Sequence, residues 1–341
     1  MITIKEIALK LGMSTTTVSN VIHGKTKEVS PETIAKVEEM LRECEYVPNI
    51  NARNLARNKS RIIGLAMKTK YGRYSNFIKD PFVSELLGAI EIEIRKKGYF
   101  MMLYISDEIE EILQQVSSWN ADGLILLGMQ GDDAVRMQEK YRNPIVCIDS
   151  YFLPEFDQFA NVGLEDEQGT CEMIRYMIQC GHRKIAFIAD NRIGVDLIRY
   201  EGYCKALREA EIPVSDRDFL QINQEEKQPG KSLERICRKA PQYSAFFCAS
   251  DYYAVTIMNA LINNGIRVPQ DISVAGFDDN LLGRICRPML TTVHQDVEKK
   301  GSLAVDILIR EIGGEDLSKT RILLPTELVI RDSVKTMNIL P

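Results

Sequence analysis

The order of hydrophobic and polar positions divides the chain into two parts. From residue 3 to about residue 45, apolar residues recur three and four positions apart, the spacing of short amphipathic helices. From about residue 61 to residue 334, short apolar runs alternate with longer segments of helical period. That alternation is typical of parallel sheets covered by helices on both faces. The sequence therefore predicts an all-α head followed by an α/β body with two parallel-sheet lobes.

Three short helices are predicted in the head. The first begins after Thr3 and Glu6, which have the spacing of a capping box. Gly12 permits a tight turn before a second helix, which Ser14 can cap. A third helix starts after Ser30, which precedes a proline. Two helices joined by a glycine turn, with a third behind them, form a helix-turn-helix unit.

The second predicted helix has an uncharged outer face. Its apolar residues point inward, and the outer positions are Thr15, Thr16, Ser19 and Asn20. Hydroxyl and amide groups can hydrogen-bond to base edges and phosphates in a major groove, whereas acidic side chains would be repelled there. We interpret this helix as a DNA-reading element. The alternative is a small helical cap with a polar face.

The charge distribution favours the DNA-reading interpretation. Residues 1–60 contain nine Lys and Arg against seven Glu, a balance of +2. Because the whole chain carries −5, the remainder carries −7. A positive head on an acidic body indicates that a polyanion would meet the head.

A basic segment, YVPNINARNLARNKSR at residues 46–61, joins the head to the body. Arg53 and Arg57 are like charges one helical turn apart, and the segment is short for an isolated helix. Ala52 and Leu55 nevertheless form a narrow apolar stripe. We expect the segment to fold on DNA, with Leu55 as a wedge in the minor groove. The alternative is a plain basic linker.

Polar residues follow several predicted strands of the body. Ligands of parallel sheets bind beyond the carboxyl ends of the strands, and two lobes would share a ligand there. The candidate pairs are Asp149-Ser150, Asp190-Asn191, Ser250-Asp251 and Asp278-Asp279. We expect Asp279 and Asp251 to be mainly structural, Asp251 as the cap of a helix that begins at Tyr252.

Composition excludes several classes of protein. At 45% hydrophobic and 27% charged residues the chain has the profile of an ordinary globular protein. No run approaches the ~18 apolar residues of a membrane span, and no secretion signal is recognisable, so a cytoplasmic location is expected. Eight scattered cysteines predict buried free thiols rather than a metal site or disulfides. The sequence holds no phosphate-binding, serine-nucleophile or metal-ligand motif, so no catalytic residue, cofactor or metal is expected.

Ordered motifs over almost the whole length carry a family resemblance. The chain resembles the lactose/galactose repressor (LacI/GalR) family of bacterial transcription regulators from Thr3 to about Val334. The matching stretches are TIKEIALKLGMSTTTVSNVIHG, VSPETIAKVEEML, YVPN, NARNLARNKSRIIGLA, DPFVSELLGAIE, CGHRKIAFIA, RYEGYCKAL, FFCASDYYAVTIMNAL, VPQDISVAGFDD, PMLTTVHQD and ELVIRDSV.

The resemblance implies a homodimer that reads a palindromic double-stranded DNA operator. It implies a helix-turn-helix domain (1–48), a hinge helix or linker (49–60) and a two-lobed effector-binding and dimerisation body of periplasmic-binding-protein-like type (61–334). The expected N-lobe covers about 61–158 and 290–318, and the expected C-lobe about 159–289 and 319–334. Only KTMNILP follows Val334, so no tetramer-forming coiled coil is expected.

The resemblance also assigns the DNA contacts. They are Thr3, Ser14, Thr15, Thr16, Ser19, Asn20, Asn49, Ala52, Arg53 and Leu55. Family members commonly have an arginine where this chain has Asn20. Arginine reads guanine and asparagine suits adenine, so we expect the operator to differ from the common family site at that base.

A small-molecule effector, a sugar or a sugar derivative, is expected between the lobes. Arg199 stands where relatives place an effector-binding arginine, and Asp278 where they place an aspartate that accepts hydrogen bonds from ligand hydroxyls. Alternatively, Arg199 is a salt-bridge partner and Asp278 a turn or cap residue. The further candidates are Asp190, Ser250, which replaces an asparagine of several sugar-responsive relatives, and Tyr74 and Phe77, which could stack on a sugar or simply fill space.

These observations favour a ligand-responsive transcription regulator, most simply a repressor, that needs no cofactor and no membrane. The alternative function is a small-molecule binding protein, such as a sugar-binding protein, without a regulatory role. That alternative predicts a secretion signal and no helix-turn-helix, and the sequence meets neither expectation. An enzyme is disfavoured because the catalytic motifs are missing from the sequence.

Overall fold

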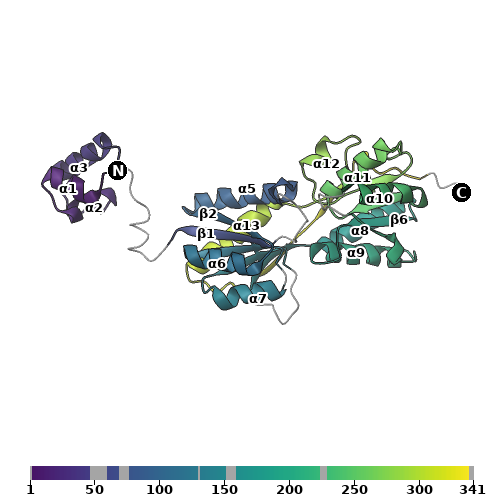
Figure 1. The fold of residues 1–341 in the computed structure, drawn as a ribbon, viewed down its shortest axis with the longest axis horizontal. Coiled ribbons are helices and arrows are strands. Elements are labelled where there is room, and N and C mark those ends of the chain that lie inside the picture. Colours follow the sequence, from purple (N-terminus) through teal and green to yellow (C-terminus); the bar gives the residue numbers. More distant parts are fainter. Residues whose placement is uncertain are drawn as a thin grey trace. The chain divides into compact units, whose positions relative to one another are not determined.

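The computed structural model describes residues 2–46, 60–68, 77–129, 131–150, 159–222 and 229–337. The chain separates into two units, residues 1–60 and 61–341, which we call the head and the body (Figure 1). The division agrees with the expected start of the body at residue 61. Most of the expected hinge lies outside the described residues, as do the candidates Asn49, Ala52, Arg53, Leu55 and Tyr74.

Three helices form the head: α1 (Ile4–Leu11), α2 (Thr15–Ile22) and α3 (Pro31–Glu43). The sequence predictions for this unit are confirmed. Thr3 and Glu6 make both hydrogen bonds of the capping box, and Gly12 turns the chain with a φ of 64°. Ser14 and Ser30 cap α2 and α3. A small core holds the three helices together, with Ile7, Val18 and Val37 fully buried at its centre.

Six parallel strands form the N-lobe sheet, in the order β11-β5-β4-β3-β1-β2. The strands are β1 (Ile62–Lys68), β2 (Phe100–Ser106), β3 (Gly123–Leu127), β4 (Ile145–Ile148), β5 (Ala160–Leu164) and β11 (Arg321–Leu324). Helices α5 (Pro81–Lys96) and α13 (Val297–Ile312) cover one face, and α6 (Ile109–Trp119) and α7 (Gly131–Lys140) cover the other (Figure 1).

The N-lobe strands are apolar throughout because both faces of the sheet are covered. In β3, Leu124 and Leu126 pack with the core of α6. The alternate residues Ile125 and Leu127 join the core beneath α5 and α13. Because successive side chains of a strand point to opposite faces of the sheet, one strand contributes residues to two separate hydrophobic layers.

Four parallel strands form the C-lobe sheet, in the order β7-β6-β8-β9. They are β6 (Ile185–Ala189), β7 (Phe219–Gln221), β8 (Ala245–Cys248) and β9 (Ser273–Ala275). Around them lie α8 (Asp166–Gln179), α9 (Val195–Glu209), α10 (Pro229–Lys239), α11 (Asp251–Asn263) and α12 (Leu281–Ile285). An antiparallel pair, β10 (Thr292–His294) with β12 (Glu327–Val329), lies where the chain passes between the lobes.

The expected lobe boundaries are wrong in two places. Residues 160–164 form β5, which pairs with β4 and so belongs to the N-lobe. Residues 321–324 form β11, which pairs with β5 and returns the chain to the N-lobe. Both strands are short, and sequence periodicity alone does not say which sheet such a strand will join.

All eight cysteines are free, and six of them are buried, as predicted. In the described part of the chain, no group of three or more His, Cys, Asp or Glu side chains is arranged to hold a metal ion. No helix among the described residues is long and apolar enough to cross a membrane.

Candidate DNA-reading surface and interlobe site

Helix α2 presents the uncharged surface that the sequence predicts. Thr15 and Thr16 are exposed, and Ser19 and Asn20 are half-buried at the edge of the same helix. The Ser14 hydroxyl accepts a hydrogen bond from the backbone N–H of Thr17 at 3.0 Å. The positive end of the helix dipole therefore lies among hydroxyl groups with no acidic residue in the first turn, a favourable setting for a phosphate.

Thr3 is already engaged by its own helix. Its backbone N–H donates to a Glu6 carboxylate oxygen at 2.7 Å, and its hydroxyl donates to the same oxygen at 2.9 Å. These two hydrogen bonds, the backbone one first, lower the pKa of Glu6. A DNA contact by the Thr3 hydroxyl would therefore compete with the capping box.

Arg199 lies at the centre of a buried polar cluster between the lobes. Its Nε donates to Asp166 at 2.7 Å, and its Nη1 donates to the backbone oxygen of Ala249 at 2.5 Å. The same Nη1 lies 3.5 Å from an Asp278 carboxylate oxygen. The guanidinium also stacks on the Phe277 ring, 3.5 Å from its centroid. The structure thus brings the two main effector candidates together, and it shows that Arg199 is an ion-pair partner as well.

Asp278 follows β9 in an unusual backbone conformation. Its φ is 120°, a region that side-chain-bearing residues rarely adopt and that costs about 1–3 kcal/mol. Gln295 donates to Asp278 Oδ1 at 2.7 Å. Burial raises the pKa of Asp278 to about 7, although nearby Arg199 acts to lower it. Such strain and such a shifted pKa are typical of functional positions.

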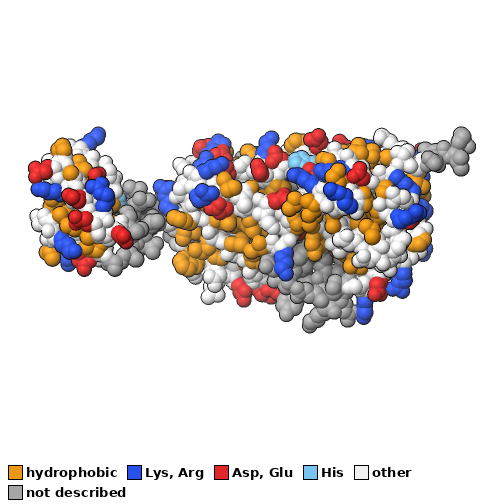
Figure 2. Space-filling view, turned by 90° about the horizontal axis from the view of Figure 1, so that it is seen from above, with side chains coloured by type: hydrophobic (Ala, Val, Ile, Leu, Met, Phe, Trp, Pro, Cys, Tyr) orange, Lys and Arg blue, Asp and Glu red, His pale blue; other side chains and the backbone are white. Residues whose placement is uncertain are grey.

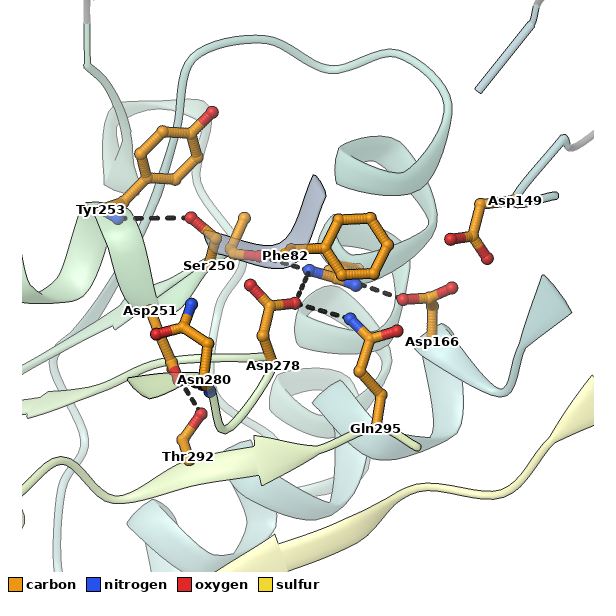
Figure 3. Close-up of polar contacts among 12 residues, drawn as sticks. Phe82, Asp149, Asp166, Ser250, Asp251, Tyr253, Asp278, Asn280, Thr292 and Gln295 are labelled. Atoms are coloured by element: carbon orange, nitrogen blue, oxygen red, sulfur yellow. Dashed lines mark hydrogen bonds and ion pairs between the residues drawn. The ribbon is translucent and has the colours of Figure 1, made fainter. Parts of the chain in front are cut away.

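Lys300 links this cluster to the N-lobe. It lies on α13 and is fully buried. Its ammonium donates to both carboxylate oxygens of Asp149 at 2.8 Å and to Gln295 Oε1 at 2.7 Å. Because Lys300 holds the amide oxygen of Gln295, the amide nitrogen faces Asp278 (Figure 3). Burial raises the pKa of Asp149, while Lys300 opposes that effect.

Sequence reasoning missed Lys300, Gln295 and Asp166. Lys299 and Lys300 look like a solvated charged pair in the sequence. The helical spacing of the segment does indicate that Lys300 is buried. Lys300 falls three residues after Val297 and four before Ala304, which places it on the buried face of α13.

The other candidates have different surroundings. Ser250 caps α11 by accepting from the backbone N–H of Tyr253 at 3.2 Å. Asp190 is half-buried and accepts a hydrogen bond from the neighbouring Asn191 amide. Phe77 begins the short helix η1 (Phe77–Lys79), and its side chain lies outside the described residues. Figure 3 shows another ring, Phe82, beside the cluster, and the Lys300 ammonium lies 5.4 Å from its centroid.

The predicted role of Asp251 as a helix cap is wrong. Ser250 supplies the cap, and Asp251 is the first residue of α11. The Asp251 carboxylate instead accepts from the Thr292 hydroxyl at 2.5 Å and from the backbone N–H of Asn280 at 2.9 Å. Its role is structural, as expected, and burial raises its pKa well above the ordinary range. The Asp279 carboxylate likewise has structural contacts, with the side chains of Arg284, His294 and Arg331.

Comparison with known proteins decides the family. Residues 3–49 match the model of bacterial regulatory proteins of the lacI family, and residues 174–334 match a periplasmic binding protein-like domain. The HTH-type transcriptional repressor PurR of Vibrio atlanticus is 31% identical over 345 residues, covering 99% of this chain and 100% of the relative. The chain belongs to the LacI family. It is a DNA-binding transcriptional repressor with a periplasmic-binding-protein-like body, and it is not an enzyme.

Solved structures agree with the LacI-family assignment. A lac repressor dimer bound to operator and the anti-inducer ONPF is 25% identical, with a TM-score of 0.84 over 98% of this chain and 99% of that chain. The transcriptional regulator CelR in complex with cellobiose is also 25% identical, with a TM-score of 0.72 over 98% of this chain and 100% of that chain.

Proposed function

We propose that this LacI-family repressor is a homodimer that binds a palindromic operator, and that a small molecule held between the lobes controls its affinity. A sugar or sugar derivative is the proposed effector. The observation that carries the proposal is the Arg199–Asp278 pair, buried beyond the strand ends and joined to the N-lobe through Gln295 and Lys300. An effector that contacts this pair acts on both lobes at once.

Exposed apolar side chains support the dimer. Phe100 and Ile105 lie on β2, the edge strand of the N-lobe sheet, and Ile92 lies on the adjacent α5. Figure 2 shows hydrophobic side chains gathered over this part of the body. In the C-lobe, Leu281 and Ile285 of α12 are more than half exposed. A similar lac repressor structure is a dimer, and burying these side chains against a second copy would be favourable.

The proposed DNA contacts divide between base reading and positioning. Thr15, Thr16 and Asn20 are the proposed base-reading residues, because they lie on the outer side of α2. Ser14, Ser19 and Thr3 are proposed phosphate contacts. Asn49, Ala52, Arg53 and Leu55 are proposed hinge contacts, with Leu55 as the minor-groove wedge. If a Leu55→Ala variant bound the operator as tightly as the unchanged protein, the wedge would be excluded.

The regulatory proposal is tested by measuring operator affinity in the presence of candidate effectors. A fluorescent inverted-repeat duplex obtained by binding-site selection is titrated with the full chain, with and without neutral sugars, sugar phosphates and nucleobases. An effector should change operator affinity by roughly 5- to 150-fold, the usual range of allosteric coupling. Arg199→Ala and Asp278→Ala should abolish the response.

A matched control comes from the same lobe. Arg175 lies on α8 and pairs with Glu209 on the protein surface. Arg175→Ala should leave the effector response intact, because this ion pair is largely solvated. If the effector still changed operator affinity in Arg199→Ala and Asp278→Ala, the interlobe site would be excluded as its binding site.

A further inference from the structure

Arg61 is the first residue of the body, and its backbone is held on both sides. Its N–H donates to Asp122 Oδ2 at 3.1 Å, and its carbonyl oxygen accepts from the backbone N–H of Phe100 at 2.8 Å. Asp122 directly precedes β3, and Phe100 begins β2. Because β2 and β3 are the two neighbours of β1 in the sheet, Arg61 is fastened to both of them before β1 begins.

The Arg61 side chain makes a further contact. Its guanidinium carbon lies 5.0 Å from the centroid of the Tyr99 ring, a cation–π contact. Tyr99 is buried, and burial raises the pKa of its hydroxyl, although the nearby charge of Arg61 opposes that effect. The ring is therefore a fixed, neutral platform for the guanidinium. We call Arg61, Tyr99 and Asp122 together the Arg61 clamp.

The backbone of Arg61 adopts a conformation that its own chemistry does not favour. Its φ is 58°, in the left-handed region that residues other than glycine seldom enter. Such a conformation persists only where the surroundings impose it, and it is frequent at functional positions. Glycine would adopt this φ more readily, but it would bring no guanidinium to Tyr99. The clamp thus holds the chain in one sharp turn at the start of the body.

The clamp is continuous with a rigid part of the N-lobe. β1 lies between β2 and β3, and its residues Ile63, Leu65 and Met67 are fully or almost fully buried in the core. The head is joined to the body through Arg61, because the chain enters β1 there. The clamp therefore fixes the position and the direction of the chain at the point where it leaves the N-lobe toward the head.

We infer that the Arg61 clamp is a positioning device for operator recognition, and that it sets the half-site spacing that the dimer accepts. The inference rests on the proposed function, because it requires a homodimer that reads an inverted repeat. In such dimers the half-site spacing follows from the geometry of the protein. A looser attachment leaves each head able to bind its half-site. It also lets the two heads engage at several spacings and lowers the effective concentration of the second head.

The test measures spacing discrimination with the full chain. Three duplexes are titrated: the selected inverted repeat, the same repeat with two base pairs inserted at its centre, and a single half-site. The unchanged protein should bind the lengthened repeat about 100-fold more weakly than the selected one. Asp122→Ala and Arg61→Gly should reduce this ratio to less than about tenfold and leave half-site affinity unchanged. Asp122→Asn keeps an oxygen that can accept from the Arg61 N–H, so it should keep most of the discrimination.

The same end of the sheet supplies a matched control. Asn143 donates to the backbone oxygen of Ala121 at 2.7 Å, beside Asp122 but without a hydrogen bond to Arg61. Asn143→Ala should therefore keep the spacing discrimination of the unchanged protein. Arg61→Gly should fold, because glycine accepts a positive φ without strain. Thermal unfolding followed by circular dichroism checks every variant, and if Asp122→Ala does not fold, Arg61→Gly alone decides.

The possible failures are distinguishable. If folded Asp122→Ala and Arg61→Gly discriminate between the spacings as sharply as the unchanged protein, the clamp does not set the spacing. The inference is also wrong if Asn143→Ala loses as much discrimination as Asp122→Ala, because general loosening of the body would then explain both results. If the unchanged protein binds the single half-site as tightly as the inverted repeat, it is the proposed reading of a palindrome by a dimer that fails.

Discussion

The DNA-reading surface of the head and the interlobe site of the body use polar groups in opposite ways. On α2 the polar groups are uncharged, and Thr15 and Thr16 are exposed. The contacts that organise this surface join residues three apart, as from Ser14 to Thr17. In the interlobe site the groups are charged and buried, and Lys300 bonds to Asp149 across 151 positions of sequence.

This difference reflects what each site has to do. Water can replace a hydrogen bond at an exposed hydroxyl, so a base-reading surface can be changed without disturbing the fold. Water cannot replace the partner of a buried charge, so removing that partner leaves the charge uncompensated inside the protein. The interlobe cluster contains residues of both lobes, so a ligand bound there would contact groups that hold the two lobes together. The head surface has no such connection to the arrangement of the lobes.

The largest expected effect comes from breaking the buried ion pair. Lys300→Met keeps most of the side-chain volume but leaves the Asp149 carboxylate buried without its cation. We expect the free energy of unfolding of the body to fall by about 3–5 kcal/mol. Urea unfolding followed by circular dichroism measures the loss.

The control for that prediction removes both charges. Lys300→Met combined with Asp149→Asn should recover much of the lost stability, because no buried charge is then left unpaired. Lys36→Met removes the cation of an exposed pair with Glu32 in the head and should leave the unfolding of the body unchanged. Equal losses in the single and double variants would mean that packing, rather than charge, explains the effect.

The same contrast explains how much could be predicted from the sequence. The head was predictable almost residue by residue, because Thr3, Ser14 and Ser30 act on their own helices through local spacing. Alternating strands and helices were predictable in the body for a similar reason. The assignment of β5 and β11 to the N-lobe was not, because pairing between distant strands leaves little trace in local pattern.

The interlobe site was predictable in part. The family resemblance predicted Arg199 and Asp278 as effector-binding residues. In the structure the Arg199 Nη1 atom lies 3.5 Å from an Asp278 carboxylate oxygen. Periodicity gives the phase of Lys300 but not its partners, since Asp149 and Gln295 approach it only once two lobes have folded. A buried lysine and a surface lysine have the same appearance in a sequence.

A substitution at Asn20 tests whether the DNA-reading surface of the head can be changed without disturbing its fold. Asn20 lies at the edge of α2 and is proposed to read adenine. Asn20→Arg should shift the preferred base toward guanine by about 1–3 kcal/mol while leaving the fold of the head unchanged. Binding-site selection with both proteins measures the shift. A guanine preference already present in the unchanged protein would contradict the assignment.

The pH dependence of stability tests the buried charge of Asp278. Its pKa is about 7 in the folded protein, so the folded state holds the proton more tightly than the unfolded chain does. Stability should therefore fall as the pH rises from about 4 to about 7, by up to about 1.4 kcal/mol per pH unit for one proton. Above that window the loss is complete.

Asp278→Asn isolates this contribution. Burial raises the pKa values of Asp149, Asp251 and Glu311 as well, and those groups are present in both proteins. Asp278 itself helps to raise the pKa of Asp251, so the substitution also reduces that shift. The charged neighbours of Asp278, namely Arg199, Lys300 and Asp80, are also unchanged. The difference between the two unfolding curves should therefore slope mainly within the window given above. A flat difference would show that Asp278 is ionised throughout.

The smallest expected effect separates capping from DNA contact within the head. Ser14 and Ser30 cap their helices through equivalent bonds, to Thr17 at 3.0 Å and to Thr33 at 3.2 Å. Alanine at either position should cost the head about 1 kcal/mol of stability, measured by thermal unfolding. Only Ser14 lies at the start of α2, so only Ser14→Ala should also weaken operator binding at temperatures where both variants are folded. Equal operator affinity in the two variants would mean that Ser14 acts as a cap alone.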